Sequence, residues 1–140
     1  MAGFYYLLIA GSRTFNDRET FDKIVAEYMP AGAAETVIVE GGAKGADTMA
    51  RDFARENGMN FSEFKPKWSK YGKAAGMFRN VEMIEFVREH GEAELGGSAL
   101  FFWDGQSRGT AQCIREARKL IPVRVWNTVE EKYMEEAEEE

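Results

Sequence analysis

Short apolar runs alternate with stretches of helical periodicity along this chain. Near-continuous apolar runs, typical of strands covered on both faces, occupy residues 4–10, 36–40, 98–103 and 122–126, with a weaker run at 60–65. Between them, apolar residues recur at the i, i+3, i+4 spacing of amphipathic helices. Strands that alternate with helices predict βαβ units with right-handed crossovers. The pattern therefore predicts a three-layer α/β sandwich with a mostly parallel, five-stranded sheet.

The predicted helices follow the strands in turn. The first is expected to begin near Asn16, with Glu19 as its capping-box partner, and to stop at Pro30. The second begins inside a glycine-rich loop and ends at residues 57–58, the third covers about 76–90, and the fourth begins near residue 109. Residues 66–75 lack such a pattern and are expected to form a loop.

Length and cysteine content narrow the class of protein. The chain has 140 residues and a single cysteine, Cys113, so it forms no internal disulfide, which suits a reducing compartment. No apolar stretch approaches the roughly 20 residues that span a bilayer. The first residues lack the basic n-region of a signal peptide. We expect a cytoplasmic protein without membrane association.

The net charge of −6 is concentrated at one end of the chain. Residues 128–140 contain seven glutamates and one lysine, so residues 1–127 are neutral as a group. We expect residues 1–127 to form one folded domain. Residues 128–140 are expected to form an acidic tail, most simply a frayed and solvated helix end.

Three glycine-containing loops follow apolar runs, at residues 11–13, 41–47 and 105–110. In a parallel sheet, the loops that leave the carboxyl ends of the strands converge on one crevice. Glycine lets the backbone approach a ligand closely, and the next helix presents free N–H groups at its N-terminus. Two of the loops carry an arginine and the third a lysine. Together they predict a site for a phosphorylated or otherwise anionic small molecule.

The loop at residues 41–47 is the most specific of the three. Gly41 and Gly42 end a strand and Gly45 precedes a helix, which suits close approach of a phosphate. The loop is neither a Walker A loop nor a G-x-G-x-x-G motif, and a purely steric role for its glycines is the alternative. Asp47 suits a helix cap and a contact to a ribose hydroxyl equally well.

The other two loops add hydrogen-bond donors. Ser12 can cap the following helix or bind phosphate, and Arg13 can bind an anionic ligand or pair with Asp17. The third loop arranges donors around a glycine: Ser107, Arg108, Gly109 and Thr110.

Residues 65–79 carry five cations and no acidic residue: Lys65, Lys67, Lys70, Lys73 and Arg79. Aromatic residues are interleaved with them, which leaves three interpretations open. The segment is a surface loop whose aromatic rings pack inward, a basic groove for single-stranded nucleic acid, or a flap over the crevice. In a flap, Lys73, Arg79 and Asn80 would be the polar contacts, and Trp68 or Tyr71 would stack on a base.

Other chemistry has little support in the sequence. His90 stands alone, so no metal site is predicted. Cys113 falls within a predicted helix without a neighbouring histidine, and we expect a buried thiol rather than a nucleophile. No paired carboxylates stand out. We predict neither a metal nor a cofactor.

Several of these motifs together resemble a known family. They are Gly-Ser-Arg-x-Phe at 11–15, Gly-Gly-Ala-Lys-Gly-Ala-Asp at 41–47, Trp68, Gly-Lys-x-Ala-Gly-x-x-Arg-Asn-x-x-Met at 72–83, and Ser-Arg-Gly-Thr at 107–110. In this order, over about residues 7–126, they resemble the YspA/YpsA-related branch of the SLOG superfamily. The resemblance implies a Rossmann-like fold that binds nucleotides or their derivatives, often in sensors or processors of bacterial and phage conflict systems.

The same superfamily contains the lysine-decarboxylase-like "Lonely guy" phosphoribohydrolases, which cleave the bond between a base and ribose 5′-monophosphate. Their arginine-containing helix motif resembles residues 79–83, which implies a functional role for Arg79. Their Pro-Gly-Gly-x-Gly-Thr motif, which glutamates follow, resembles the stretch that ends at Gly109 and Thr110.

The chain departs from that pattern after Thr110, where Ala111, Gln112 and Cys113 replace the glutamates. Gln112 can neither take a proton nor balance an oxocarbenium charge, so the departure weakens the hydrolase hypothesis and leaves ligand binding intact. Asp47 or Asp104 would have to supply the missing carboxylate.

We therefore predict a protein that binds a nucleotide or nucleotide-derived ligand, for sensing or sequestration, and that forms a homodimer or higher homo-oligomer. An N-glycosidic hydrolase or transferase, with Arg79 and Asp47 as catalytic residues, and a single-stranded nucleic-acid binder are the alternatives. The expected ligand contacts are Gly11, Ser12, Arg13, Gly41, Gly42, Ala43, Lys44, Gly45, Asp47, Trp68, Lys73, Arg79, Asn80, Ser107, Arg108, Gly109 and Thr110.

Overall fold

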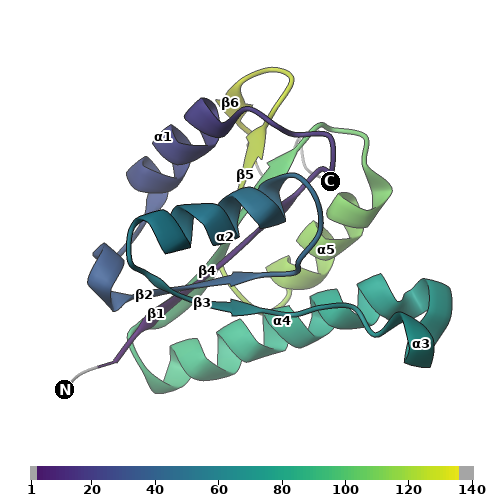
Figure 1. Ribbon diagram of the computed structural model, residues 1–140, viewed down its shortest axis with the longest axis horizontal. Coiled ribbons are helices and arrows are strands. Elements are labelled where there is room, and N and C mark those ends of the chain that lie inside the picture. Colours follow the sequence, from purple (N-terminus) through teal and green to yellow (C-terminus); the bar gives the residue numbers. More distant parts are fainter. Residues whose placement is uncertain (1–2, 136–140) are drawn as a thin grey trace.

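Six strands form one sheet in the order β3-β2-β1-β4-β5-β6 in the computed structural model, which describes residues 3–135 (Figure 1). The parallel strands are β1 (Tyr5–Gly11), β2 (Thr36–Glu40), β3 (Asn60–Glu63), β4 (Gly96–Trp103) and β5 (Val123–Asn127), and β6 (Lys132–Tyr133) is antiparallel to β5. The helices are α1 (Arg18–Tyr28), α2 (Ala46–Glu56), α3 (Trp68–Tyr71), α4 (Ala75–Ala93) and α5 (Arg108–Arg118), with 3₁₀ turns η1 (Ala33–Glu35) and η2 (Gly72–Ala74). The predicted α/β class and Rossmann-like layout are confirmed.

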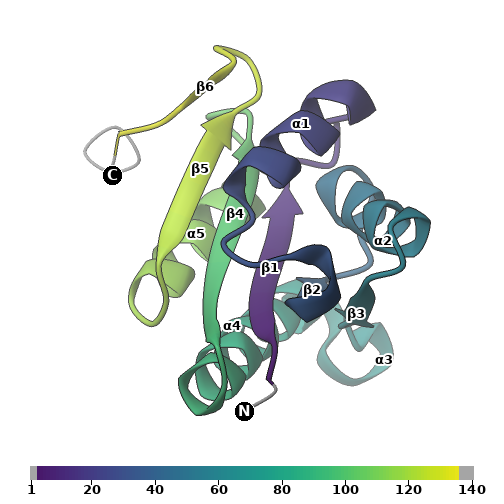
Figure 2. The ribbon, with the colours of Figure 1, turned by 90° about the vertical axis from the view of Figure 1, so that its left-hand side faces the viewer.

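The sheet separates two apolar cores. Helices α1 and α2 cover one face, where Leu7 and Ile9 of β1 are buried, and α4 and α5 cover the other, where Leu8 is buried. Figure 2 shows the sheet between these helix layers. Because successive residues of a strand point to opposite faces and both faces are covered, the strands appear in the sequence as unbroken apolar runs.

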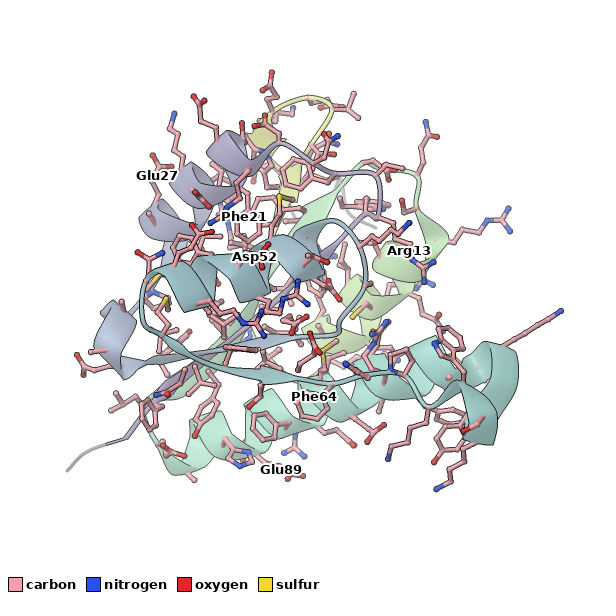
Figure 3. All side chains as sticks on the ribbon, in the orientation of Figure 1. Arg13, Phe21, Glu27, Asp52, Phe64 and Glu89 are labelled. Carbon is pink, nitrogen blue, oxygen red and sulfur yellow. The ribbon has the colours of Figure 1, made fainter. Side chains whose placement is uncertain are left out.

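The helices present the faces that their periodicity predicts. On α1, Phe21, Ile24 and Val25 are buried. Figure 3 shows Phe21 directed into the molecule and Glu27 and Glu89 directed outward from α1 and α4. Apolar burial of this kind stabilises a helix more than its intrinsic propensity does.

The sheet has one strand more than the five predicted. Asn127 Oδ1 accepts hydrogen bonds from the N–H groups of Val129 (2.9 Å) and Glu130 (2.8 Å), which turns the chain back along β5. Tyr133 then packs its ring edge-on against Trp126, at 5.1 Å between centroids. The helix end expected from residue 128 onward is therefore wrong for residues 128–135, because side-chain contacts draw this segment onto the sheet edge. Residues 136–140 lie outside the described residues.

Two smaller predictions are also wrong. The first helix is capped by Asp17 rather than Asn16, because Asp17 Oδ1 accepts the N–H of Thr20 at 3.1 Å. The expected loop at 66–75 contains α3 and η2, since the Tyr71 ring packs 4.5 Å from that of Phe78, between centroids, and anchors the turn on α4. The cap is a local contact that either neighbouring residue could make, and the ring contact joins two elements, so apolar periodicity predicts neither.

The connections reverse direction between β1 and β4, which lie side by side at the centre of the sheet. The chain passes from β1 through α1 and α2 to β3 on one face, then returns through α4 and α5 on the other. At such a switch point the loops diverge and leave a crevice beyond the carboxyl ends of the strands. Within residues 3–135, no helix is long and apolar enough to cross a membrane.

Candidate functional site

A cleft of about 500 Å³ lies at the switch point, between the loops that follow β1, β2 and β4 and the first turns of α4 and α5. Most of the predicted ligand contacts line it: Gly11, Arg13, Ala43, Asp47, Trp68, Lys73, Arg79, Asn80, Ser107, Gly109 and Thr110. Gly41, Gly42 and Lys44 line an adjoining cavity instead. Ser12, Gly45 and Arg108 line neither of the two.

Ser12 joins the two central loops from within the protein. Its hydroxyl is buried, accepts the N–H of Asp104 at 3.1 Å and lies 3.2 Å from the hydroxyl of Ser107. The carboxylate of Asp104 in turn accepts the N–H groups of Gln106 (2.9 Å) and Ser107 (2.7 Å). This network holds the loop after β4 against the loop after β1 and so shapes the wall of the cleft.

Two of the glycines are required by the protein's own backbone. A Cβ on Gly11 would lie 2.2 Å from the carbonyl oxygen of Phe102 in β4. A Cβ on Gly45, which has φ +84°, would lie 2.4 Å from the carbonyl oxygen of Ser12. At these positions the alternative raised from the sequence, a steric role, accounts for the glycine.

Gly109 is different, because a Cβ there would meet nothing within 4 Å. It lies in the first turn of α5 and faces the cleft. The first helical bond of α5 runs from the N–H of Ala111 to the carbonyl of Ser107, and the Ser107 side chain gives no capping bond. Within the described residues the N–H groups of residues 108–110 therefore have no partner, and the helix N-terminus is open to an anion.

In the loop at 41–47, by contrast, the first three backbone N–H groups are already used. The Oδ2 atom of Asp47 accepts the N–H groups of Gly41 (3.1 Å) and Ala43 (3.3 Å), and Glu40 Oε1 accepts that of Gly42 (2.7 Å). This loop cannot cradle a phosphate with these three groups. Asp47 organises the loop, a role that the sequence did not separate from a ribose contact.

Burial dominates the electrostatics of Asp47, which is 4% exposed. It raises the pKa of the carboxyl to about 6, against the opposing effects of the Arg79 guanidinium, the N–H groups of Ala43 and Gly41, and Arg13. Arg13 thus lies near Asp47, and among the described residues it forms no ion pair with Asp17. Asp17 caps α1 instead.

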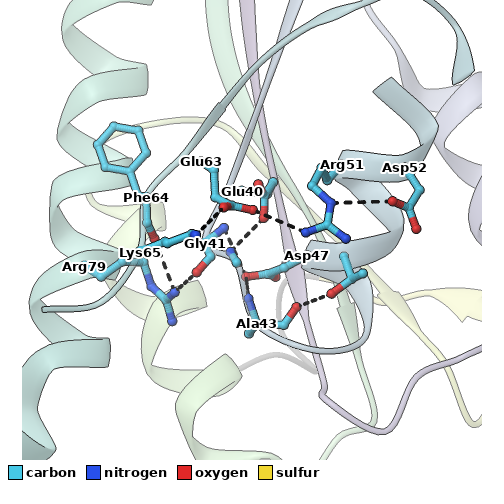
Figure 4. Close-up of polar contacts among 12 residues, drawn as sticks. Glu40, Gly41, Ala43, Asp47, Arg51, Asp52, Glu63, Phe64, Lys65 and Arg79 are labelled. Atoms are coloured by element: carbon cyan, nitrogen blue, oxygen red, sulfur yellow. Dashed lines mark hydrogen bonds and ion pairs between the residues drawn. The ribbon is translucent and has the colours of Figure 1, made fainter. Parts of the chain in front are cut away.

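Arg79 projects from the first turns of α4 into the wall between the two cavities and is 8% exposed. Its guanidinium donates to the carbonyl oxygens of Gly41 and, at 3.5 Å, Phe64 (Figure 4). Its Nε donates to Asn80 Oδ1 at 2.8 Å. Among residues 3–135 no carboxylate lies within 4.0 Å of it. The protein thus holds a buried positive charge with only neutral hydrogen-bond partners.

A pair of glutamates lies beneath the loop at 41–47. Glu40 of β2 and Glu63 of β3 are register partners, and each has one carboxylate oxygen buried without a hydrogen-bond partner among the described residues (Figure 4). Burial, and then a hydrogen bond with Glu63, raise the pKa of Glu40 to about 8. Glu40 therefore keeps its proton near neutral pH, because burial and the neighbouring Glu63 carboxylate disfavour its ionised form.

We expect Glu40→Gln to remove a loss of stability at alkaline pH. The folded state raises the pKa of Glu40 from 4.5 to about 8. The protonated carboxyl therefore makes its full contribution to the free energy of unfolding below pH 4.5, and this contribution is lost as the pH rises through about 8. Glutamine keeps the acceptor for the Gly42 N–H and cannot ionise. Thermal unfolding at about pH 6 and about pH 9 should show a drop for the natural chain that Glu40→Gln lacks.

The control for that experiment is Glu85→Gln, which changes an exposed glutamate of α4. It should retain the alkaline drop in melting temperature. An equal drop in Glu40→Gln and the natural chain would contradict the raised pKa of Glu40.

Several cleft residues were missed by sequence reasoning as ligand contacts: Ala10, Thr14, Gly76, Met77, Asp104, Gln112 and Cys113. The spacing held some signal, since Gln112 and Cys113 follow Gly109 by one helical turn. Burial raises the pKa of the Cys113 thiol to about 12, so it stays protonated and unreactive. No group of three or more potential metal ligands occurs within the described residues.

The fold and the cleft define a Rossmann-like α/β protein with a basic, glycine-lined crevice at its switch point. The chain belongs to the YspA, cpYpsA-related SLOG family, whose sequence model matches residues 6–71. It is similar to the Gene 61 protein of Mycobacterium phage D29, with 37% identity over 123 residues that cover 84% of this chain and 92% of the phage protein. No solved structure matches it. The family resemblance predicted from the motifs is confirmed.

Proposed function

We propose that the protein binds a nucleotide or nucleotide-derived ligand in this cleft and acts by sensing or sequestration. The observation that carries the proposal is the buried guanidinium of Arg79, which has no carboxylate partner within the described residues. The nearby Asp47 carboxyl compensates part of this charge, but it forms no ion pair with Arg79. Burial of a charge without an ion-pair partner is costly, and a bound anion would offset that cost. Arg13 and Lys73 line the same cleft and add to its positive potential.

The α5 N-terminus supports a phosphoryl group as the anion. Its free N–H groups and the positive end of the helix dipole face the cleft, and Gly109 leaves room for close approach. Ser107 and Thr110 contribute hydroxyl groups to the same wall.

Trp68 supports the nucleoside part of the ligand. Its ring lines the cleft and is 54% exposed, which is unusual for so large an apolar side chain. A base stacked on the ring would cover this surface. Asn80 offers an amide nearby, so the cleft combines one stacking surface with polar groups that orient the ligand.

The carboxylates of the cleft favour binding over cleavage. Asp47 Oδ2 and both oxygens of Asp104 hold hydrogen-bond donors of their own loops. Burial alone raises the pKa of Asp104, but the hydrogen bonds from Ser107 and Gln106 outweigh it, and the net pKa lies below its usual range. Asp104 is therefore ionised at neutral pH and does not serve as a general acid.

A thermal-shift series tests the proposal. Mononucleotides, dinucleotides, ADP-ribose and cyclic nucleotides are compared at fixed salt with the corresponding nucleosides, which lack phosphate. A ligand at about 100 times its dissociation constant adds roughly 2.7 kcal/mol to the free energy of unfolding, which is a shift of several degrees. We expect such a shift from at least one phosphorylated ligand and none from its nucleoside.

Equal shifts from a nucleoside and its nucleotide would contradict the phosphoryl site. No shift across the series would overturn the proposal. A single-stranded oligonucleotide belongs in the same series, because binding that weakens steeply with salt would support the nucleic-acid alternative instead.

A further inference from the structure

A second cavity of about 580 Å³ adjoins the cleft and has no role in the proposal above. The two cavities share a wall made of Arg13, Ala43, Trp68 and Arg79. Beyond that wall, the second cavity is lined by the 41–44 loop, Lys65 and Pro66. A ligand in the cleft that extends past Trp68 therefore enters this basic lobe, as we call the second cavity.

The lining of the basic lobe has one sign of charge. Arg13, Lys44, Lys65 and Arg79 line it, and no carboxylate does. Lys65 Nζ lies 3.6 Å from Glu63 Oε1, but its side chain is 78% exposed and free to turn toward the lobe. A concave surface that gathers cations in this way concentrates anions.

Three of the backbone N–H groups that border this lobe are not available to an anion. The N–H groups of Gly41, Gly42 and Ala43 donate to Asp47 and Glu40, which fixes the loop and leaves the side chains to bind. Gly42 has φ +73° and is exposed, so the loop turns without a side chain there to fill the lobe. Long lysine and arginine side chains surround the space left open at Gly42. They suit a phosphoryl group that is held by charge and side-chain hydrogen bonds.

We propose that the basic lobe is a second anion subsite, so that the ligand is a nucleotide with at least one phosphoryl group beyond the first. The first phosphoryl group lies at the α5 N-terminus, and Arg79, in the shared wall, contacts both groups. This inference rests on the proposed function. Two sources supply the same chemistry, a linear polyphosphate such as ATP and a pyrophosphate bridge such as that of ADP-ribose.

Titration calorimetry with AMP, ATP and ADP-ribose tests the subsite. The natural chain is compared with Lys44→Ala/Lys65→Ala, which removes two cations of the basic lobe. The matched control, Lys67→Ala/Lys70→Ala, removes two cations from neighbouring positions that line neither cavity. We expect ATP or ADP-ribose to bind the natural chain at least about tenfold more tightly than AMP, as hydrogen bonds to charged groups allow.

Lys44→Ala/Lys65→Ala should lose the tighter binding of ATP or ADP-ribose and keep its affinity for AMP within about twofold. The control variant should retain the affinities of the natural chain for AMP and for the longer ligands. Whichever of ATP and ADP-ribose loses more affinity identifies the linear or the bridged ligand. Equal losses for AMP and the longer ligands, or an equal effect of the control, would overturn the subsite. If AMP binds and neither longer ligand binds more tightly, the subsite alone is wrong; if none of the three binds, the proposed function fails as well.

Discussion

Arg79→Met is expected to weaken nucleotide binding by roughly 100-fold, the value of a lost charged contact in a desolvated site. The guanidinium lines both cavities and is buried without an ion-pair partner among the described residues, so a bound phosphoryl group would supply one. Methionine has a similar length and fills the space without charge. The affinity is measured by calorimetry with a nucleotide that shifts the melting temperature of the natural chain.

The stability of Arg79→Met should change far less than its affinity. The substitution leaves the carbonyl oxygens of Gly41 and Phe64 without this donor and the ionised Asp47 without this cation, both of which cost stability, but it also removes a buried charge, which restores some. Arg79→Lys keeps the charge and loses the planar fork, so we expect an intermediate affinity.

Arg88→Ala provides the control for this prediction. It removes an arginine further along α4 that pairs with Glu92 at 3.6 Å and lines neither cavity. Its nucleotide affinity should match that of the natural chain. An Arg79→Met protein that binds within about threefold of the natural chain would remove the central argument for an anion site.

Gly11→Ala is expected to lower the stability of the fold, whereas Gly109→Ala is expected to keep stability and weaken nucleotide binding, although both glycines line the cleft. The Cβ added by Gly11→Ala would overlap the carbonyl oxygen of Phe102, which is backbone in the centre of the sheet and cannot turn away. We expect a loss of at least about 3 kcal/mol in the free energy of unfolding, enough to unfold a marginally stable domain. Denaturant unfolding measures this loss.

Gly109→Ala should leave the fold unchanged or slightly more stable. No atom outside the neighbouring helix backbone lies within 4 Å of the added methyl group, and alanine favours a helix by up to about 1 kcal/mol. The methyl group stands where a phosphoryl group would approach the α5 N-terminus, so nucleotide affinity should fall about tenfold or more.

Gly32→Ala serves as the control for both substitutions. Gly32 has ordinary space around it, with Glu35 Oε1 at 3.7 Å, and lines neither cavity. Its stability and affinity should remain those of the natural chain. A stable Gly11→Ala protein would contradict the packing argument, and undiminished nucleotide affinity in Gly109→Ala would remove the α5 N-terminus from the site.

The three glycine-containing loops illustrate how far sequence reasoning reaches. Their positions after apolar runs predicted that they meet at one crevice, and the structure brings them together. Their glycines look alike in the sequence, yet Gly11 and Gly45 accommodate the protein's own backbone whereas Gly109 faces open space. A sequence does not show which backbone atom lies opposite a glycine, because that atom belongs to a distant segment.

For the polar residues too, the sequence predicted which residues matter, and only the structure showed their roles. Ser12 and Asp47 fitted a ligand contact and a structural role equally well, and their buried hydrogen bonds assign both a structural role in shaping loops. Glu40 and Glu63 had no signal as a pair, because they belong to different strands that only the register of the sheet brings together. Homo-oligomerisation stays a prediction, and nucleic-acid binding stays an alternative.

The sequence by itself determined the α/β class and the order of the main elements, because unbroken apolar runs and helix amphipathicity are local patterns. Its motifs indicated the family. It also placed the candidate chemistry at the ends of strands. Only the tertiary structure decided that β6 extends the sheet, that Arg79 is buried without an ion-pair partner among the described residues, and that a basic lobe adjoins the cleft. These features arise from contacts between residues far apart in the chain, which no local pattern encodes.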